Sequence, residues 1–156
     1  MRILILSDSH RISQRVREAY ELIEDVSMII HLGDGERDMA ALDDLPAGVK
    51  VVQVRGNCDF GSDLPAVELL DVGGKRLLCT HGHLFHVKFG DAMIMEEAEK
   101  YNADITLYGH THTPVTKFKS GRYYFNPGSL LDGNFGYIDI VGDGVNCVQL
   151  NLKDFR

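Results

Sequence analysis

Short apolar runs recur along the chain and predict β-strands, and in the first two thirds of the sequence they alternate with segments of helical spacing. The clearest helical segment covers residues 13–24, where the apolar side chains fall on one face. Residues 38–42 and 91–101 are also predicted to be helical. Strands are predicted at residues 2–6, 28–32, 49–54, 67–72, 76–79, 105–108, 123–125, 136–141 and 145–152.

The order of these elements indicates the fold class. Helices and strands alternate up to about residue 108, and from residue 115 onward the pattern is entirely β, with glycine-rich turns. Gly73 and Gly74 mark a hairpin turn between two strands. We therefore expect a layered α/β fold with mixed strand pairing. With 156 residues, 44% of them apolar, the chain is the size of one domain, residues 1–156, with one sizeable core.

Charge restricts the partners that the protein can bind. The sequence carries 23 acidic and 16 basic residues, a net charge of -7 with neutral histidines. Binding to extended nucleic acid depends on many Lys and Arg side chains that neutralise phosphates, so we expect no such partner. A small anionic substrate would need a local positive site that overrides the charge of the whole protein.

No segment of the sequence predicts a membrane span or a signal peptide. No apolar run approaches the roughly 20 residues that a spanning helix needs. The N-terminal segment has an early Asp8 and no cleavage site after a long apolar stretch, so we expect a cytoplasmic protein. Cys58, Cys79 and Cys147 are odd in number and widely spaced, which fits neither a disulfide framework nor a CxxC zinc site. We expect reduced thiols.

Polar residues follow five of the apolar runs at the point where each predicted strand ends. In order along the chain these segments are Ser7-Asp8-Ser9-His10, Gly33-Asp34, Arg55-Gly56-Asn57, Thr80-His81-Gly82-His83 and Gly109-His110-Thr111-His112. In open α/β sheets the carboxyl ends of neighbouring strands share one crevice, so these five ends can converge. The glycines allow the backbone to turn sharply and to approach a ligand closely.

The spacing within two of these segments favours a metal site. Asp8-x-His10 and His110-x-His112 place both side chains of each pair on the same side of an extended chain, about 6.5 Å apart. Imidazole and carboxylate ligands suit divalent manganese, iron, cobalt, nickel or zinc. Seven candidate ligands are too many for one tetrahedral ion and fit two ions, about 3.5 to 4 Å apart, that share a carboxylate.

The five segments, taken in order, resemble the motifs of the calcineurin-like metallophosphoesterases. The matching pieces are Asp8-x-His10, Gly33-Asp34, Gly56-Asn57-Cys58-Asp59, Thr80-His81-Gly82-His83 and Gly109-His110-Thr111-His112. The resemblance runs from Met1 to about Leu131 and is nearest to small single-domain bacterial and archaeal phosphodiesterases. It implies a four-layer α/β/β/α sandwich of two mixed sheets flanked by helices.

The same resemblance implies a binuclear metal centre and a role for each residue. The implied ligands are Asp8, His10 and His112 for one ion, Asn57, His81 and His110 for the other, and Asp34 as the bridge between them. Manganese is the first expectation for both ions, and nickel, iron, cobalt and zinc stay open. A hydroxide that bridges the ions would attack a small phosphate ester while the ions neutralise the phosphoryl oxygens.

One position departs from the pattern of the family and affects the choice of catalytic acid. Many members carry a histidine directly after the asparagine, where it is thought to protonate the leaving group, and this chain has Cys58. A thiol with a pKa of about 8.5 suits that role less well. His83 or a metal-bound water would replace it, or the leaving group needs little help. The candidate catalytic residues are therefore Asp34, His10, His83 and Cys58, and a phosphodiester is favoured over a simple alkyl monoester.

Other functions stay open at this stage. The same fold serves as a non-catalytic protein-interaction scaffold in the retromer subunit, and Cys58 agrees with that alternative, whereas the complete set of ligand types favours catalysis. A metal-dependent hydrolase that acts on a non-phosphate ester is a third hypothesis. Each aspartate or histidine taken alone could be an ordinary turn or capping residue. A homo-oligomer stays open because exposed strand edges in the β tail could pair with another subunit.

Overall fold

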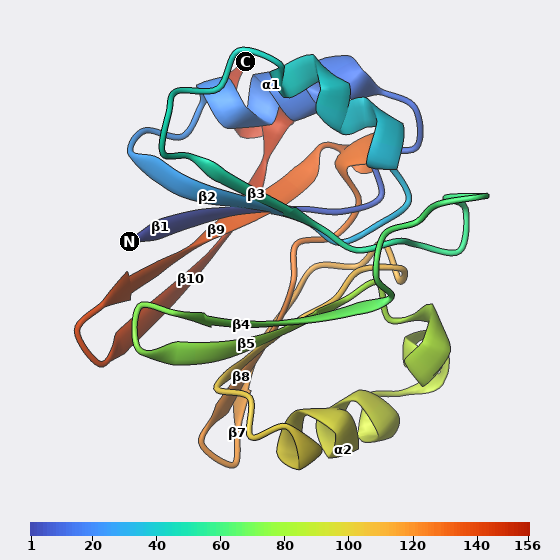
Figure 1. Cartoon of the computed structure of the whole chain (residues 1–156), viewed down its shortest axis with the longest axis vertical. Coiled ribbons are helices and arrows are strands. Elements are labelled where there is room, and N and C mark those ends of the chain that lie inside the picture. The colour runs from blue at the N-terminus through green and yellow to red at the C-terminus, as the bar shows by residue number, and fades with distance from the viewer.

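The computed structural model describes residues 1–156 and contains two five-stranded sheets that lie face to face. Figure 1 shows helices on the outer face of each sheet, so the layers follow the order helix, sheet, sheet, helix. This arrangement confirms the predicted α/β/β/α sandwich. No helix combines the length and the apolar character needed to cross a membrane.

Both sheets contain parallel and antiparallel strands. The first sheet has the order β10-β9-β1-β2-β3, with β1 at Arg2–Leu6, β2 at Val26–His31, β3 at Lys50–Gln53, β9 at Asn134–Val141 and β10 at Gly144–Asn151. The second has the order β4-β5-β6-β8-β7, with β4 at Val67–Val72, β5 at Lys75–Thr80, β6 at Ile105–Leu107, β7 at Val115–Lys119 and β8 at Arg122–Asn126. In each sheet three adjacent strands are parallel, β1-β2-β3 and β5-β6-β8. Their carboxyl ends therefore lie at one edge of each sheet.

The two α-helices are shorter than the sequence pattern suggests, and the helix predicted at residues 38–42 is a longer 3₁₀ segment. The α-helices are α1 at Ser13–Glu21 and α2 at Ala92–Lys100, and the 3₁₀ segments are η1 at Glu36–Leu42, η2 at His83–Phe85, η3 at Val87–Phe89, η4 at Leu130–Asp132 and η5 at Leu152–Phe155. The first predicted helix was expected to reach residue 24 but ends at Glu21, because the chain must turn through Asp25, at φ 60°, to enter β2. The expectation of an entirely β tail is wrong at η4 and η5.

Local hydrogen bonds explain the two helical turns in the tail. Gly133, at φ 87°, ends η4 in the left-handed region and donates its N–H to the Leu130 carbonyl. The side chain of Asn151 accepts the Lys153 N–H and turns the end of β10 into η5. Such side-chain capping depends on single residues and leaves no hydrophobic period in the sequence.

Successive side chains of a strand point to opposite faces of its sheet, and this divides the core into layers. On β1, Ile3 and Ile5 face the second sheet, whereas Leu4 and Leu6 face the outer layer that contains α1. The inter-sheet core includes Leu77, Cys79, Ile105, Leu107 and Phe125 from the second sheet. A third cluster packs α2 against the other face of that sheet. Because a strand presents successive side chains to opposite faces, apolar strands of this kind are buried on both sides.

The two sheets pack closely at a position where β9 lacks a side chain. Gly136 is buried, and a Cβ placed on it would lie 2.7 Å from Cζ of Phe125 and would also meet the carbonyl of Val148. Phe125 is fully buried between the sheets, so it has no room to retreat.

We expect Gly136→Ala to lower the free energy of unfolding by about 1 to 3 kcal/mol, because the added methyl group overpacks the inter-sheet core. Urea denaturation followed by circular dichroism measures the change. Val141→Ala, at an exposed position of the same strand, is the matched control and should alter stability by less than about 0.5 kcal/mol. Equal stabilities of the two variants would contradict this account of the sheet packing.

Candidate metal centre

The ends of five parallel strands supply the predicted ligands. Asp8 and His10 follow β1, and Asp34 follows β2. The loop after β3 carries Asn57, and the second sheet contributes the remaining three histidines, after β5 and β6. The structure brings all seven side chains to the shared edge of the two sheets, and it separates them into two neighbouring groups.

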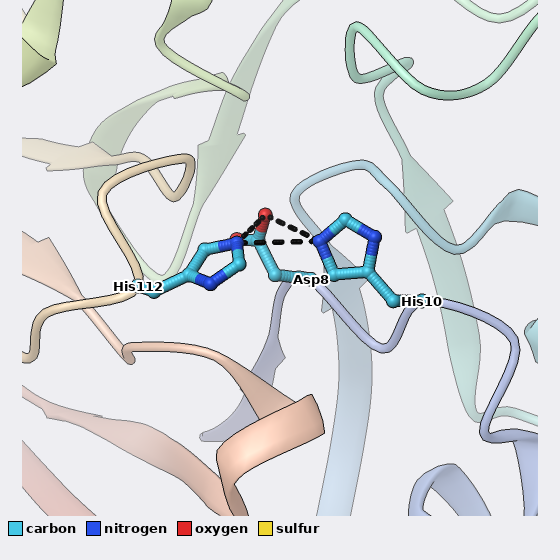
Figure 2. A group of neighbouring side chains, drawn as sticks. All are labelled: Asp8, His10 and His112. Atoms are coloured by element: carbon cyan, nitrogen blue, oxygen red, sulfur yellow. Dashed lines mark hydrogen bonds and ion pairs between the residues drawn. The ribbon is translucent and has the colours of Figure 1, made fainter.

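The first group consists of Asp8, His10 and His112, whose donor atoms lie within 4.8 Å of one another. Figure 2 shows the two imidazole rings approaching from opposite sides with the Asp8 carboxylate between them. The Nε2 atoms of His10 and His112 are 3.2 Å apart. Oδ1 of Asp8 lies 3.5 Å from Nε2 of His10 and 3.2 Å from Nε2 of His112.

The second group is centred on Nε2 of His81. This atom lies 3.2 Å from Nδ1 of His110 and 3.1 Å from Oδ1 of Asn57. It is also 3.3 Å from Oδ2 of Asp34. The same Asp34 oxygen is 3.9 Å from Nε2 of His10, so Asp34 faces both groups.

The spacing of the donor atoms fits divalent ions. Two donors that each lie about 2.1 Å from one ion are about 3.0 to 3.4 Å apart in octahedral or tetrahedral geometry. The separations in both groups are close to this range, from 3.1 to 3.5 Å. In addition, Oδ1 of the fully buried Asp8 has no hydrogen-bond partner. A buried carboxylate oxygen without a partner is costly, and a cation in the first group would supply one.

Hydrogen bonds fix which atoms of the buried ligands face the centre. Nδ1 of His81 lies 2.7 Å from the carbonyl of Leu32, and since a carbonyl only accepts, Nδ1 carries the proton and Nε2 is directed to the centre. Oδ2 of Asp8 accepts the hydroxyl of Ser7 at 2.5 Å and the N–H of His110 at 3.1 Å, leaving Oδ1 free. Oδ1 of Asp34 accepts the N–H of Cys58 at 2.7 Å, leaving Oδ2 free.

The titration behaviour of these groups reflects a concentrated negative charge. Burial lowers the pKa of His81, but its close contact with Asp34 and the charges of Asp8 and Asp34 outweigh burial and raise this pKa overall. Burial raises the pKa of Asp34, and the contacts with His81 and Cys58 outweigh it and hold this pKa well below its usual range. Burial and the nearby His81 lower the pKa of His110 to about 4. Carboxylates that attract a proton to His81 attract a metal cation in the same way.

The backbone at the centre is held in an uncommon conformation. Asp8, His10, Asp34, His110 and His112 all have positive φ, from 45° to 67°. Residues other than glycine rarely adopt this region, although Asp and His tolerate it better than most, and each such position costs on the order of 1 to 3 kcal/mol. The sharp turns direct these side chains back over the strand ends. Strain at five ligand positions indicates that the surrounding packing maintains the site.

Close packing beneath the first group depends on Gly109. A Cβ at this residue would collide with the hydroxyl of Ser7 and would lie 2.8 Å from Oδ2 of Asp8. Glycine therefore allows the loop after β6 to rest on the carboxylate that both histidines face. The sequence pattern identified this glycine as a turn residue, and the structure adds this packing role.

Two further residues support the centre, and the sequence pattern gave neither of them a role. The Ser7 hydroxyl orients Asp8, as described above. The Asp59 carboxylate accepts the N–H groups of Asp34, Gly35, Glu36 and Gly56 at 2.8 to 3.1 Å, which ties the loops after β2 and β3 together. Asp59 belongs to the Gly56-Asn57-Cys58-Asp59 segment, which is part of the family resemblance. This membership was the only sign in the sequence that Asp59 has a role at the site.

Cys58 and His83, the two candidates for the catalytic acid, occupy different places. Sγ of Cys58 belongs to a group with His10 and Asp34 whose donor atoms lie within 4.8 Å of one another. Burial and the charge of Asp34 raise the pKa of its thiol. The His83 ring lies 5.4 Å from the His81 ring, and burial together with the charge of His81 lowers its pKa. The thiol therefore retains its proton, and His83 is neutral, at neutral pH.

Residues 1–138 match the calcineurin-like phosphoesterase superfamily domain, and the chain therefore belongs to this superfamily. It is 34% identical over 131 residues to the probable metallophosphoesterase YsnB of Bacillus subtilis, covering 83% of this chain and 75% of the relative. It is also 30% identical to the phosphodiesterase YfcE of Escherichia coli strain K12, covering 97% of this chain and 93% of the relative.

Solved structures agree with this assignment. A predicted phosphoesterase from Streptococcus pneumoniae superposes with a TM-score of 0.81 at 28% identity, covering 97% of this chain and 90% of that one. Vps29 of Entamoeba histolytica, in a structure described as a complex with Zn²⁺, superposes with a TM-score of 0.74 at 20% identity, covering 97% and 99%. The second likeness concerns the fold alone.

Removal of the Ser7 hydroxyl should weaken metal binding. We expect Ser7→Ala to raise the dissociation constant for Mn²⁺ about 10- to 100-fold, because the hydrogen bond that orients Asp8 is lost. Competition with a fluorescent chelator measures the constant. Ser27→Ala, at the start of β2 and away from the centre, should bind Mn²⁺ like the unaltered protein. Equal affinity of both variants would exclude an orienting role for Ser7.

Replacement of Asp59 should loosen the loops of the site. In Asp59→Asn an amide N–H₂ group would face donors that now meet a carboxylate oxygen, so we expect a loss of about 2 kcal/mol or more of unfolding free energy. Urea denaturation gives the value. Asp63→Asn is the matched control because Asp63 is exposed and makes no hydrogen bond. A difference between the two variants smaller than about 0.5 kcal/mol would contradict the proposed role.

Proposed function

We propose that the protein is a metal-dependent phosphodiesterase that hydrolyses a small phosphate ester at a binuclear centre. The observation that supports this proposal most strongly is the pair of adjacent donor groups with Asp34 facing both, at 3.3 Å from His81 and 3.9 Å from His10. Membership of the phosphoesterase superfamily and the phosphodiesterase relative in Escherichia coli support the same chemistry. A bridging carboxylate between two sets of imidazole ligands suits manganese and other first-row divalent ions.

The ligand residues divide into two sets. Asp8, His10 and His112 would hold one ion, Asn57, His81 and His110 would hold the other, and Asp34 would contact both. When bound, such ions lower the pKa of water at the site and offset the negative charge of the phosphoryl group. The chain itself supplies the rigid positions: buried carboxylates fixed by Ser7 and by the Cys58 N–H, and imidazoles held at strained strand ends.

The surroundings of the centre favour a phosphodiester with a good leaving group. Departure of an alkoxide is assisted by a nearby acid. Cys58 retains its proton more firmly than an ordinary thiol, and His83 is neutral at neutral pH. Neither group is a strong proton donor, so esters whose leaving group departs without protonation should react fastest. This supports the preference for diesters over simple alkyl monoesters.

With Mn²⁺ present, the protein should hydrolyse bis(p-nitrophenyl) phosphate, and His112→Ala or Asp34→Asn should lower kcat/KM by at least about a hundredfold. Release of p-nitrophenolate measures the rate. His86→Ala and Asp63→Asn, at exposed positions outside both donor groups, are matched controls and should retain the activity. Circular dichroism of each variant establishes that it folds.

The alternative, a non-catalytic interaction scaffold, has the fold-level likeness to Vps29 in its favour. A folded, metal-loaded protein that hydrolyses no activated diester or monoester would contradict the enzymatic proposal and favour the scaffold. Hydrolysis of carboxylic esters in preference to phosphate esters would instead favour the third hypothesis, a metal-dependent hydrolase of non-phosphate esters. A substrate panel with added manganese, nickel or zinc separates the three outcomes.

A further inference from the structure

A cavity of about 380 Å³ opens directly beside the metal centre, and most of its lining residues have no role in the proposed hydrolysis. It shares His10, Asp34 and Cys58 with the centre, and Arg11, Arg37 and Phe60 belong to the rest of its wall. Its volume lies within the range of small-molecule sites. A group attached to a phosphate at the centre could therefore extend into this cavity.

The two guanidinium groups of the lining are free to bind an anion. The side chains of Arg11 and Arg37 make no hydrogen bond and no salt bridge within the chain. They differ in this from Arg2, Arg17 and Arg76, which pair with carboxylates. An unpaired guanidinium at the wall of a cavity is suited to a phosphate group, which it can bind through two parallel N–H···O bonds.

The lining also contains the acidic residues Asp34, Glu36, Asp38 and Asp59, which keep their negative charge, so a phosphate would depend on direct contact with the two guanidinium groups. Hydrogen bonds within the chain hold several of these carboxylates in place. Oδ2 of the buried Asp38 accepts the Ser9 hydroxyl at 2.5 Å and the Arg11 N–H at 2.9 Å. Asp59 accepts four backbone N–H groups, as described above. Glu36 is partly buried and its carboxylate has no partner in the chain, so it can accept new hydrogen bonds, as can Oδ1 of Asp38.

The same wall contains an aromatic ring. Phe60 is 85% exposed, so its ring faces solvent instead of a core. Exposed aromatic side chains beside basic residues are typical of sites that stack a nucleobase, which contributes about 1 to 3 kcal/mol per base. The cavity thus combines cations for phosphate, a ring for a base and a free carboxylate that can accept hydrogen bonds from ribose hydroxyls.

We propose that this cavity binds a nucleotide arm of the substrate, so that the preferred substrate class is a short nucleotide diester with a second phosphate. The second phosphate would contact Arg11 and Arg37, and the base would stack on Phe60. The proposal rests on the proposed phosphodiesterase function. A ribose alkoxide leaves less readily than an aryl oxide, so the preference for nucleotides would come from binding in the cavity and not from the leaving group. The net charge of -7 restricts it to short molecules, because a long polyanion would extend over the acidic surface.

The backbone gives Arg11 a fixed starting point for this role. It follows His10 directly, has φ 70°, and its N–H is held by the buried Asp38. Its side chain therefore begins one residue from a candidate metal ligand, which limits how far the second phosphate can lie from the reacting one. Asp38 acts here as a positioning residue, because it contacts the backbone of Arg11 and lies at the cavity wall.

Two dinucleotides that differ only in a terminal phosphate test the proposal. With Mn²⁺ present, kcat/KM should be higher for 5′-phosphorylated diadenylate (pApA) than for unphosphorylated diadenylate (ApA). Arg37→Gln and Arg11→Gln should each lower the ratio of the two values about tenfold, as expected for a lost charge-assisted hydrogen bond of about 1.4 kcal/mol. Lys50→Gln removes one positive charge at an exposed position of β3 and should leave the ratio unchanged.

An unchanged ratio in both arginine variants, with activity on diesters retained, would overturn the cavity assignment and leave the phosphodiesterase function intact. A second measurement does not depend on turnover. Calorimetry on the metal-free protein should show that adenosine 5′-monophosphate binds more tightly than adenosine, and that Arg37→Gln weakens its binding about tenfold.

Equal binding of the nucleotide to the unaltered protein and to Arg37→Gln would likewise overturn the assignment. If no diester is hydrolysed with any metal but the nucleotide binds in an Arg37-dependent manner, the phosphodiesterase function fails and the cavity assignment stands. Phe60→Leu keeps an apolar side chain but removes the ring, and it should weaken nucleotide binding severalfold. A dissociation constant unaffected by this change would exclude base stacking.

Discussion

The packing of one sheet against the other controls the metal centre, because each donor group draws residues from both sheets. Asp8 and His10 come from the first sheet and meet His112 from the second. Likewise Asp34 from the first sheet meets His81 from the second, and the hydrogen bond from His81 to the Leu32 carbonyl joins the sheets at this edge. A small change in the separation of the sheets would therefore disturb both groups together.

The centre also illustrates how a site can oppose the stability of the fold that carries it. Asp8 is fully buried and one of its oxygens has no partner, and several ligand positions have left-handed backbone conformations. Both features are unfavourable by themselves. A cation that binds only the folded chain would compensate for them, since its binding free energy adds to the free energy of unfolding. Metal binding at this centre would therefore raise the free energy of unfolding.

The sequence predicted most strands, and it predicted that the seven candidate ligands lie close together, for different physical reasons. Buried strands leave continuous apolar runs, and polar residues at the carboxyl ends of parallel strands are directed to one crevice. The exact helix ends, η4 and η5 depend on single turn residues such as Asp25 and Asn151, which carry no periodic signal. The roles of Ser7 and Asp59 depend on contacts between loops, and the position of a loop follows from tertiary packing.

A protein with a net negative charge can still bind an anionic ester, because solvent screens the charges that lie far from the binding site. At physiological ionic strength, charges in solvent are screened beyond about 8 to 10 Å. A small ester at the strand ends would thus respond mainly to nearby charges, which are those of the centre, of the unpaired Arg11 and Arg37, and of the acidic residues in the same cavity wall. A long polyanion would also contact the acidic surface farther away. If the protein binds a small phosphate ester as proposed, the same charge distribution would disfavour a polymer, and part of the selectivity for size would follow from electrostatics.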